Sequence, residues 1–361
     1  MLLVVNAGSS SMKLAVFDAG LCERARAEVA EISSAGHAAA LPEAMKQLGV
    51  EFGDLTAAAH RVVHGGATLV APCRLTPDVI AQIEACVPLA PLHNPANLTA
   101  IKALAQIAPD LPQFASFDTA FHATNPEVAV RYAIPAADAA LGIRRFGFHG
   151  LSYASVVHAL QVMTGDSLPK RLLALHLGNG ASLCAILDGR SVATTMGYSP
   201  LGGLTMGTRA GEIDGNAVLR LAQVHGIDRA AQILNRESGL LALGGASDMR
   251  AIEQMQAPEA RFAVDHFCYW AVRHAGSMIA AMGGLDGIVF TGGMGENAAS
   301  IRARILDGLA WAGAFYDPNA NRLGVAGLHE TLSNVAIWIV PTQEERQIAS
   351  EAFALMGISS E

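Results

Sequence analysis

LLVVNAGSSSMKLAVFDAG (residues 2–20) decides the fold, because LLALHLGNGASLCAILDGR (residues 172–190) repeats its pattern. Each stretch reads as a strand, a turn of small residues, a second strand and an acidic turn with glycine. One offset of 170 residues (178 − 8) relates the pairs Gly8–Gly178, Ala15–Ala185 and Asp18–Asp188. The shared register favours duplication over chance similarity. A hairpin repeated at half-chain distance predicts two related domains that face each other.

The composition gives the chain enough apolar material for two cores. Its 361 residues exceed one ordinary domain of ~150 residues, and 52% are hydrophobic against 16% charged. The net charge is −8, from 24 Lys and Arg against 32 Asp and Glu. This balance disfavours nonspecific nucleic-acid binding through phosphate contacts, so we expect no nucleic-acid partner. A small anionic substrate would need local positive groups.

The sequence predicts a cytoplasmic protein without a membrane segment. The start has no basic region and its apolar run stops at a polar turn, so we expect no signal peptide. No uninterrupted apolar run is long enough to span a bilayer. The five cysteines form no C-x-x-C pair. We expect reduced, buried thiols, as is usual in the cytoplasm.

Strand-like and helix-like segments alternate along the chain, which predicts an α/β fold. Apolar runs bounded by turn residues predict strands at 2–5, 14–17, 57–63, 114–117, 172–176, 182–187, 287–291 and 336–340. Helical spacing predicts helices at 42–48, 77–86, 96–107, 152–163, 216–225, 261–282, 298–309 and 344–356.

The two hairpin turns are candidates for phosphate binding. The first, NAGSSSMK (residues 6–13), is not a P-loop, because a strand rather than a helix follows it. Glycines in both turns free the backbone, and exposed N–H groups in such turns form anion-binding nests. Ordinary hairpin turns are the alternative for each taken alone; as a facing pair they predict a phosphate clamp. The candidate contacts are Ser9, Ser10, Ser11 and Lys13 in the first turn, and Gly178, Asn179 and Gly180 in the second.

A third candidate is DGIVFTGGMGENAASI (residues 286–301). A strand is expected to run into a glycine-rich loop and then a helix, whose N-terminus can receive a phosphate or ribose. The loop also fits the loose dinucleotide fingerprint. We discount that interpretation, because no partner strand with a ribose-binding acid clearly follows.

Taken together, these elements resemble the acetate kinase family, within the superfamily of actin, sugar kinases and heat-shock chaperones. The resemblance runs through nearly the whole chain. Its ordered motifs are NAGSSSMK (6–13), HRVVHGG (60–66), PLAPLHNP (88–95), FDTAFH (117–122), RRFGFHG (144–150), HLGNG (176–180), MGTRAG (206–211), GMGEN (293–297) and PTQEE (341–345).

The resemblance implies two ribonuclease-H-like domains with a nucleotide cleft between them. The expected division is 1–123 with 347–361 for the first domain and 124–346 for the second. The chain is short for this family between Asp18 and Ala57, so we expect a trimmed sheet edge in the first domain. The implied reaction is reversible phosphoryl transfer from ATP to acetate, which needs charge neutralisation and alignment.

The family's catalytic positions fall on five residues here. By resemblance, Arg61 orients the substrate carboxylate, and Arg209 stabilises the transferring phosphoryl group; guanidinium forks suit both tasks. Asp118 ends a short strand and is expected to position the substrate or an arginine. Its required protonation state stays open. His149 and His176 are expected to contact the phosphoryl group.

The remaining implied residues bind nucleotide, metal and acyl group. Asn6 and Glu344 match the positions for Mg²⁺, or Mn²⁺ in its place, which must accompany ATP. The acyl pocket positions are Val63, Leu92, Phe148 and Pro200. The nucleotide positions, besides the two turns, are His176, Leu177, Asp248, Met249, Arg250, Gly292, Gly293, Met294, Gly295, Glu296 and Asn297.

Several alternatives stay open at this stage. GGASDMR (residues 244–250) is one residue shorter than usual, with Met249 in place of an aromatic, so the base preference is undecided. A propionate or butyrate kinase differs from an acetate kinase by methylenes worth only ~1–3 kcal/mol each. A catalytically silent nucleotide-binding regulator on the same fold is the other alternative. The family is typically a homodimer through the second domain, where the long helix 261–282 could supply an apolar face.

Overall fold

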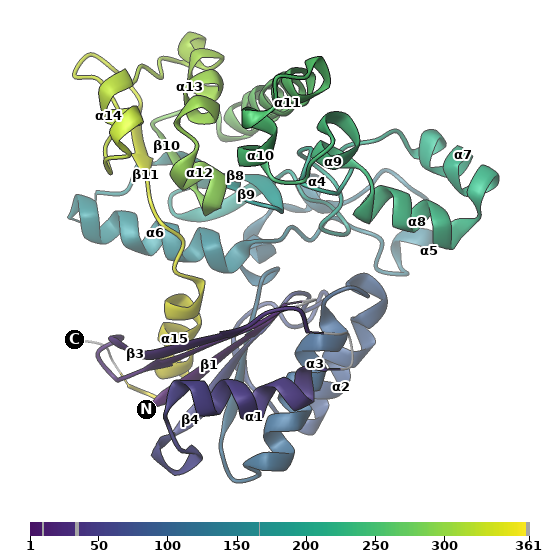
Figure 1. The fold of residues 1–361 in the computed structure, drawn as a ribbon, viewed down its shortest axis with the longest axis vertical. Helices are drawn as coiled ribbons and strands as arrows, with labels where there is room; N and C mark the ends of the chain where they lie inside the picture. The colour runs from purple at the N-terminus through teal and green to yellow at the C-terminus, as the bar shows by residue number, and fades with distance from the viewer. Residues whose placement is uncertain (9–10, 33–35, 166, 359–361) are drawn as a thin grey trace. The chain divides into compact units, whose positions relative to one another are not determined.

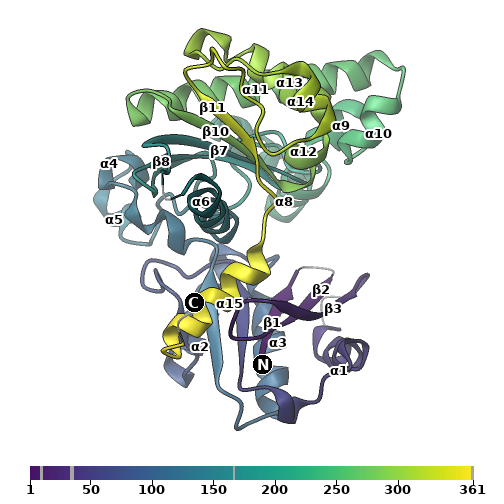
Figure 2. The same cartoon turned by 90° about the vertical axis from the view of Figure 1, so that its left-hand side faces the viewer.

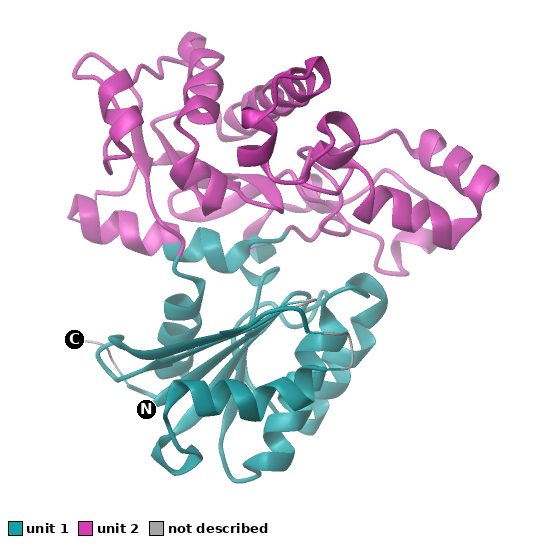
Figure 3. Ribbon diagram, in the orientation of Figure 1, with its two compact units in different colours: residues 1–123, 148–155, 343–361 teal, residues 124–147, 156–342 magenta. Residues whose placement is uncertain are grey.

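The computed structural model describes residues 1–8, 11–32, 36–165 and 167–358. The chain forms two compact units (Figure 3). Unit 1 contains residues 1–123, 148–155 and 343–361, and unit 2 contains residues 124–147 and 156–342. The domain division expected from the sequence stays a prediction, as does a nucleotide cleft between the domains.

Unit 1 is built on a six-stranded sheet in the order β3-β2-β1-β4-β6-β5. Strands β1, β2 and β3 are antiparallel neighbours, whereas β4 and β6 continue from β1 in parallel and β5 ends the sheet antiparallel to β6. Strand β3 therefore forms one edge. The strands are β1 Leu2–Ala7, β2 Met12–Phe17, β3 Glu23–Val29, β4 Ala57–Val62, β5 Cys73–Arg74 and β6 Gln113–Phe117.

Helices cover both faces of this first sheet (Figure 1, Figure 2). Alternate residues of a strand point to opposite faces, so Leu3 and Val5 pack toward α1 and α3, while Leu2 and Val4 pack toward α15. This explains why β1 is a continuous apolar run rather than an alternating one. The helices of unit 1 are α1 His37–Leu48, α2 Pro77–Ala85, α3 Asn94–Ile107 and α15 Glu344–Leu355, with 3₁₀ turns η1 Phe52–Asp54, η2 Val87–Leu89 and η3 Ala120–Thr124, whose last residue belongs to unit 2.

Unit 2 has a five-stranded sheet in the order β11-β10-β7-β8-β9. Strands β7, β8 and β9 are antiparallel, and β10 and β11 lie parallel to β7. This repeats the order β6-β4-β1-β2-β3 of unit 1. The expected α/β fold with two sheets is confirmed. The strands are β7 Arg171–Leu177, β8 Ala181–Leu187, β9 Arg190–Thr194, β10 Gly287–Thr291 and β11 Ala336–Ile339.

The two hairpins match in topology but not in register. Val4 pairs with Ala15 in the first hairpin, whereas Ala174 pairs with Cys184 in the second. The offset is 170 residues in the first strand (174 − 4) and 169 in the second (184 − 15), because the second turn is one residue shorter. The constant offset predicted from the sequence is therefore wrong beyond the turn.

The long helix α11, Pro258–Met282, packs on β8, β7 and β9. The expected glycine-rich loop after β10 is itself a short helix, α12 Gly292–Asn297, so that prediction is wrong in detail. The other helices are α4 Glu127–Val130, α5 Ala136–Ala139, α6 Gly150–Thr164, α7 Gly215–His225, α8 Ile227–Arg236, α9 Gly239–Gly244, α10 Met249–Gln254, α13 Ala299–Asp307 and α14 Pro318–Leu323, with the 3₁₀ turn η4 Ala310–Ala312. In the described part of the chain no helix combines the length and apolar character needed to cross a bilayer.

Candidate functional site

Arg61 lies at the centre of a polar cluster in unit 1. It sits near the end of β4 on the sheet face that α15 covers. Its guanidinium donates to Asp118 at the end of the neighbouring β6, with Nη2 2.6 Å from Oδ2 and Nε 3.0 Å from Oδ1. Strands β4 and β6 are parallel, so their carboxyl ends meet at one edge of the sheet. The fold thereby forms a forked ion pair from residues far apart in sequence.

The surroundings keep Arg61 charged. Burial by itself lowers the pKa of the guanidinium, but the carboxylates of Asp118 and Glu344 more than offset this and raise the pKa above its usual value. The Asp118 residue is only 1% exposed, so the ion pair is largely shielded from water. A substrate carboxylate approaching Arg61 would therefore meet a fixed, oriented cation.

Asn6 and Glu344 converge on one nitrogen of Arg61. The Nη1 atom lies 3.2 Å from Asn6 Oδ1 and 3.4 Å from Glu344 Oε2. Two oxygen atoms that face one cationic group are the kind of ligand set that Mg²⁺ uses when it retains most of its waters. Across the described ranges, no group of three or more His, Cys, Asp or Glu side chains is arranged to hold a metal. The residues present thus fit a sparsely ligated Mg²⁺.

Lys13 belongs to the same face of the sheet. It is the register partner of Asn6 in the β1–β2 pair, and directly opposed residues share a face. Lys13 therefore lies on the side of Arg61 and Asp118. In the turn before it, Gly8 N donates to Ser11 O at 2.8 Å. Two further predicted phosphate contacts, Ser9 and Ser10, lie outside the described residues.

Two side chains that the sequence did not single out hold this first turn. His37, at the start of α1 and fully buried, places Nε2 2.7 Å from Gly8 O. Because a carbonyl can only accept, Nε2 carries the proton. Asn97 of α3 donates to Ala7 O at 2.7 Å. These two side chains therefore hold the backbone at Ala7 and Gly8 through its carbonyl oxygens.

Substitutions at His37 test this support. The amide nitrogen of glutamine can reach the place of His Nε2, whereas that of asparagine is closer to Nδ1. We expect His37→Gln to keep the KM for ATP, the phosphoryl donor that the family resemblance implies, near that of the wild-type protein. His37→Asn is expected to raise this KM about tenfold, the loss of a hydrogen bond worth ~1.4 kcal/mol. Steady-state kinetics would check this. Equal KM values for both variants would contradict a role through Gly8.

Asp118 also anchors the loop that carries His149. Gly150 N donates to Asp118 O at 2.8 Å, and a Cβ on Gly150 would lie 2.2 Å from that oxygen. His149 itself has φ of 60°, a strained value for a non-glycine residue. Such strain is retained where the surroundings fix the backbone, and it sets the direction of the imidazole.

Three predicted acyl-pocket residues lie in unit 1. Phe148 and Val63 are buried, and the Phe148 ring packs edge-on to His64 with ring centroids 5.4 Å apart. Leu92 is 37% exposed. The fourth residue, Pro200, belongs to unit 2.

Arg209 is the cation of interest in unit 2. Its Nη1 donates to Pro200 O at 3.0 Å, and among the described residues it has no carboxylate partner. Burial lowers the pKa of this guanidinium. Gly239 presses on the same loop, since a Cβ there would lie 2.7 Å from Arg209 O. An arginine held in place without a counter-ion is suited to receive an anion.

The second hairpin turn contacts the loop that carries Arg209. Gly207 N donates to Asn179 O at 3.2 Å, and Gly178 N to Gly180 O at 3.1 Å. His176, at the end of β7, is 9% exposed, and its Nε2 lies 3.7 Å from the position a Cβ would take on Gly178. The structure therefore brings His176, the turn and the loop together within unit 2.

A cavity of about 420 Å³ opens beside this turn. Eight predicted nucleotide residues line it: Gly178, Asn179, Asp248, Met249, Arg250, Gly293, Met294 and Asn297. Others do not, namely His176, Leu177, Gly180, Gly292, Gly295 and Glu296. Glu296 instead accepts from Gly292 N and Thr342 N, at 3.0 and 3.2 Å. It thereby braces the start of α12.

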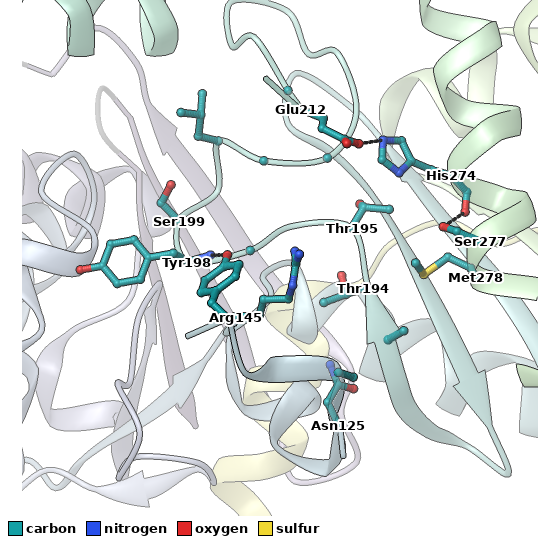
Figure 4. Close-up of a pocket in the computed structure, with 18 of the residues that line it drawn as sticks. Asn125, Arg145, Thr194, Thr195, Tyr198, Ser199, Glu212, His274, Ser277 and Met278 are labelled. Atoms are coloured by element: carbon teal, nitrogen blue, oxygen red, sulfur yellow. Dashed lines mark hydrogen bonds and ion pairs between the residues drawn. The ribbon is translucent and has the colours of Figure 1, made fainter. Parts of the chain in front are cut away.

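A second cavity in unit 2, of about 660 Å³, was not anticipated from the sequence (Figure 4). The Arg145 guanidinium lies over the Tyr132 ring at 4.8 Å, and Tyr132 Oη accepts from Tyr198 N at 3.1 Å. His274 and Glu212 form another part of the wall, with Nε2 and Oε2 3.4 Å apart. These contacts join residues from distant segments, which a sequence motif does not reveal.

Comparisons with known proteins show the family of the chain. The sequence model of the Acetokinase family matches residues 23–350. A Rhodopseudomonas palustris protein named acetate kinase is 42% identical over an alignment of 389 residues that covers 98% of each chain. Since 389 exceeds 361, the alignment contains gaps in this chain. This agrees with the expectation that the chain is short for its family.

Two solved structures have the same fold at moderate identity. The crystal structure of Porphyromonas gingivalis acetate kinase is 32% identical with a TM-score of 0.90, covering 98% of this chain and 99% of that one. A propionate kinase from Francisella tularensis is 34% identical with a TM-score of 0.91, covering 97% and 98%. On these matches across its length, the chain belongs to the acetokinase family.

Proposed function

We propose that the protein is an acetate kinase that transfers the γ-phosphoryl group of ATP to acetate, reversibly, giving acetyl phosphate and ADP. Family membership supports the reaction class. The observation that carries the proposal is the cluster in which Arg61 contacts Asp118, Asn6 and Glu344. In this cluster Arg61 is an oriented cation that can bind a carboxylate, and the oxygens of Asn6 and Glu344 beside it can bind a metal ion.

The transfer is written as one in-line displacement. A carboxylate oxygen of acetate forms a bond to the γ-phosphorus while the bond from that phosphorus to the β–γ bridging oxygen breaks, and the electron pair leaves with ADP. Arg61 holds the attacking carboxylate, and Asp118 holds Arg61. Arg209, His149 and His176 stabilise the charge that spreads over the equatorial oxygens.

Bound nucleotide and metal complete the proposed site. Mg²⁺, or Mn²⁺, would be held by Asn6 and Glu344 and would neutralise charge on the β- and γ-oxygens. The 420 Å³ cavity is the proposed place of the nucleoside, with Met249 in its lining. Lys13 and the two hairpin turns are proposed to contact the phosphates.

The proposal is tested by hydroxamate trapping of acyl phosphate. The protein is incubated with ATP, Mg²⁺ and acetate, propionate or butyrate in parallel. We expect acetyl hydroxamate with the highest kcat/KM among the three. Preference for propionate would favour the alternative that the Francisella tularensis propionate kinase suggests, and preference for butyrate would favour a butyrate kinase. If the protein binds ATP but forms no acyl phosphate from any of the three carboxylates, the result would favour a catalytically silent nucleotide-binding regulator.

We further propose a cytoplasmic homodimer. ATP as the phosphoryl donor supports the location. For the assembly, α11 exposes Phe262 (56%) and Tyr269 (64%). Large apolar side chains that are exposed on one long helix favour a protein partner, here a second copy. Light scattering in solution gives the mass, and a monomer at micromolar concentration would contradict the dimer.

A further inference from the structure

The amide of Asn6 is held at both of its ends. Its Nδ2 donates to Glu345 Oε1 at 3.0 Å, and its Oδ1 accepts from Arg61 Nη1 at 3.2 Å. A carboxylate can only accept and a guanidinium can only donate. The two contacts therefore allow one orientation of the amide, with the oxygen turned toward Arg61 and Glu344.

We propose that Glu345 is a positioning residue that orients Asn6. It turns the amide oxygen of Asn6, and not the nitrogen, toward the place beside Arg61 Nη1 that the Glu344 carboxylate also faces. The inference rests on the proposed function, because the oxygen is what a divalent cation would bind. An Asn6 amide turned by half a rotation would offer Nδ2, a donor, to the cation. Without Glu345, Nδ2 loses its acceptor among the described residues, and only the contact of Oδ1 with Arg61 Nη1 still opposes that rotation.

The helix explains why adjacent glutamates take different tasks. Successive residues of an α-helix point about 100° apart, from 3.6 residues per turn. At the start of α15, Glu344 thus faces Arg61 while Glu345 faces Asn6. Both side chains are 13% exposed, so each is set against the sheet.

Glu345 is itself held from the edge strand. Its Oε2 lies 3.9 Å from Arg26 Nη1 on β3. Arg26 in turn donates to both carboxylate oxygens of Glu23, at 2.9 and 2.6 Å. The chain of contacts runs from the sheet edge through Arg26 and Glu345 to Asn6. These contacts connect β3 to β1 through Glu345 and do not include Arg61.

The test measures metal binding by electron paramagnetic resonance of Mn²⁺ with the protein and saturating ADP. Residues that orient metal ligands typically change metal affinity by about 10–100-fold. Glu345→Ala is therefore expected to lower the affinity for Mn²⁺ at least tenfold. Glu345→Gln keeps an acceptor for Nδ2 and is expected to bind Mn²⁺ within about threefold of the wild-type protein. Glu43→Ala, which removes an exposed carboxylate from α1 on the opposite face of the sheet, is the matched charge control.

The outcomes separate this inference from the proposed function. Mn²⁺ affinity of Glu345→Ala equal to that of Glu43→Ala would overturn the positioning role, even if the wild-type protein forms acetyl phosphate. Equal weakening in Glu345→Gln and Glu345→Ala would also overturn it, because charge rather than orientation would then be responsible. Selective weakening in Glu345→Ala supports it, even if no acyl phosphate forms. Thermal unfolding of each variant shows whether the fold is retained.

Discussion

Replacing Arg209 with alanine is expected to lower kcat for acetyl phosphate formation by about 10³-fold or more, the scale of arginines that stabilise phosphoryl transfer. The reason lies in its environment. The side chain is held by Pro200 O, and among described residues it has no carboxylate to neutralise it. Its charge is therefore available to an anion. Coupled assay of ADP release gives kcat and KM separately.

Two further variants sharpen this prediction. Arg209→Lys keeps the charge but loses the planar fork, so its kcat should fall between those of wild type and Arg209→Ala. Arg220→Ala, at an exposed arginine on α7, should leave kcat unchanged. We expect the Arg209→Ala protein to unfold within a few degrees of the wild-type temperature, because the arginine has a hydrogen bond to Pro200 O but no ion pair to lose. A kcat within tenfold of wild type would remove Arg209 from the reaction.

The Arg61–Asp118 pair was within reach of sequence reasoning, but its geometry was not. Arg61 lies near the end of one predicted strand and Asp118 directly follows another, and parallel strands place their carboxyl ends together. The pattern of single strands does not give their order in a sheet. The adjacency of β4 and β6 places the two side chains within hydrogen-bond distance.

Contacts between distant segments were not accessible from the sequence. Asn6 and Glu345 are separated by 339 residues. The family resemblance marked Asn6 and Glu344 but gave no reason to consider Glu345, because only the helical angle between adjacent residues separates their tasks. His37 was missed for a similar reason. Its bond to Gly8 depends on where α1 packs, and the sequence shows only a histidine before a helix.

Local propensity also misled at two places. Gly292, Gly293 and Gly295 favour a loop by composition, yet they lie in the short helix α12. Gly292 meets a different requirement: its φ is 78°, and a Cβ there would lie 2.9 Å from Leu177 O, so the position needs glycine. The hairpin offset was predicted wrongly in the second strand, because the similar residues there fit an offset of 170 as well as one of 169. A turn one residue shorter changes the pairing without changing the pattern.

Removing the Asp118 carboxylate is expected to damage both turnover and stability. In Asp118→Ala, Arg61 loses its forked partner, and displacement of the guanidinium by about 1 Å would cost kcat roughly 10²-fold. The same change leaves a mostly buried cation with only Glu344 and Asn6. We expect a loss of about 3 kcal/mol in the free energy of unfolding, at the low end for broken buried pairs because Arg61 keeps 20% exposure. Urea unfolding measures it.

A double-mutant cycle separates the coupling between Arg61 and Asp118 from the effect of each residue alone. If Asp118 acts through Arg61, the kcat of Arg61→Ala with Asp118→Ala should equal that of Arg61→Ala alone. The double variant should also regain part of the lost stability, because no unpaired cation remains. Additive losses in kcat would show instead that Asp118 contacts the substrate independently. Asp118→Asn keeps the shape and removes the charge, so loss of turnover in that variant would assign the effect to the carboxylate rather than to a cavity.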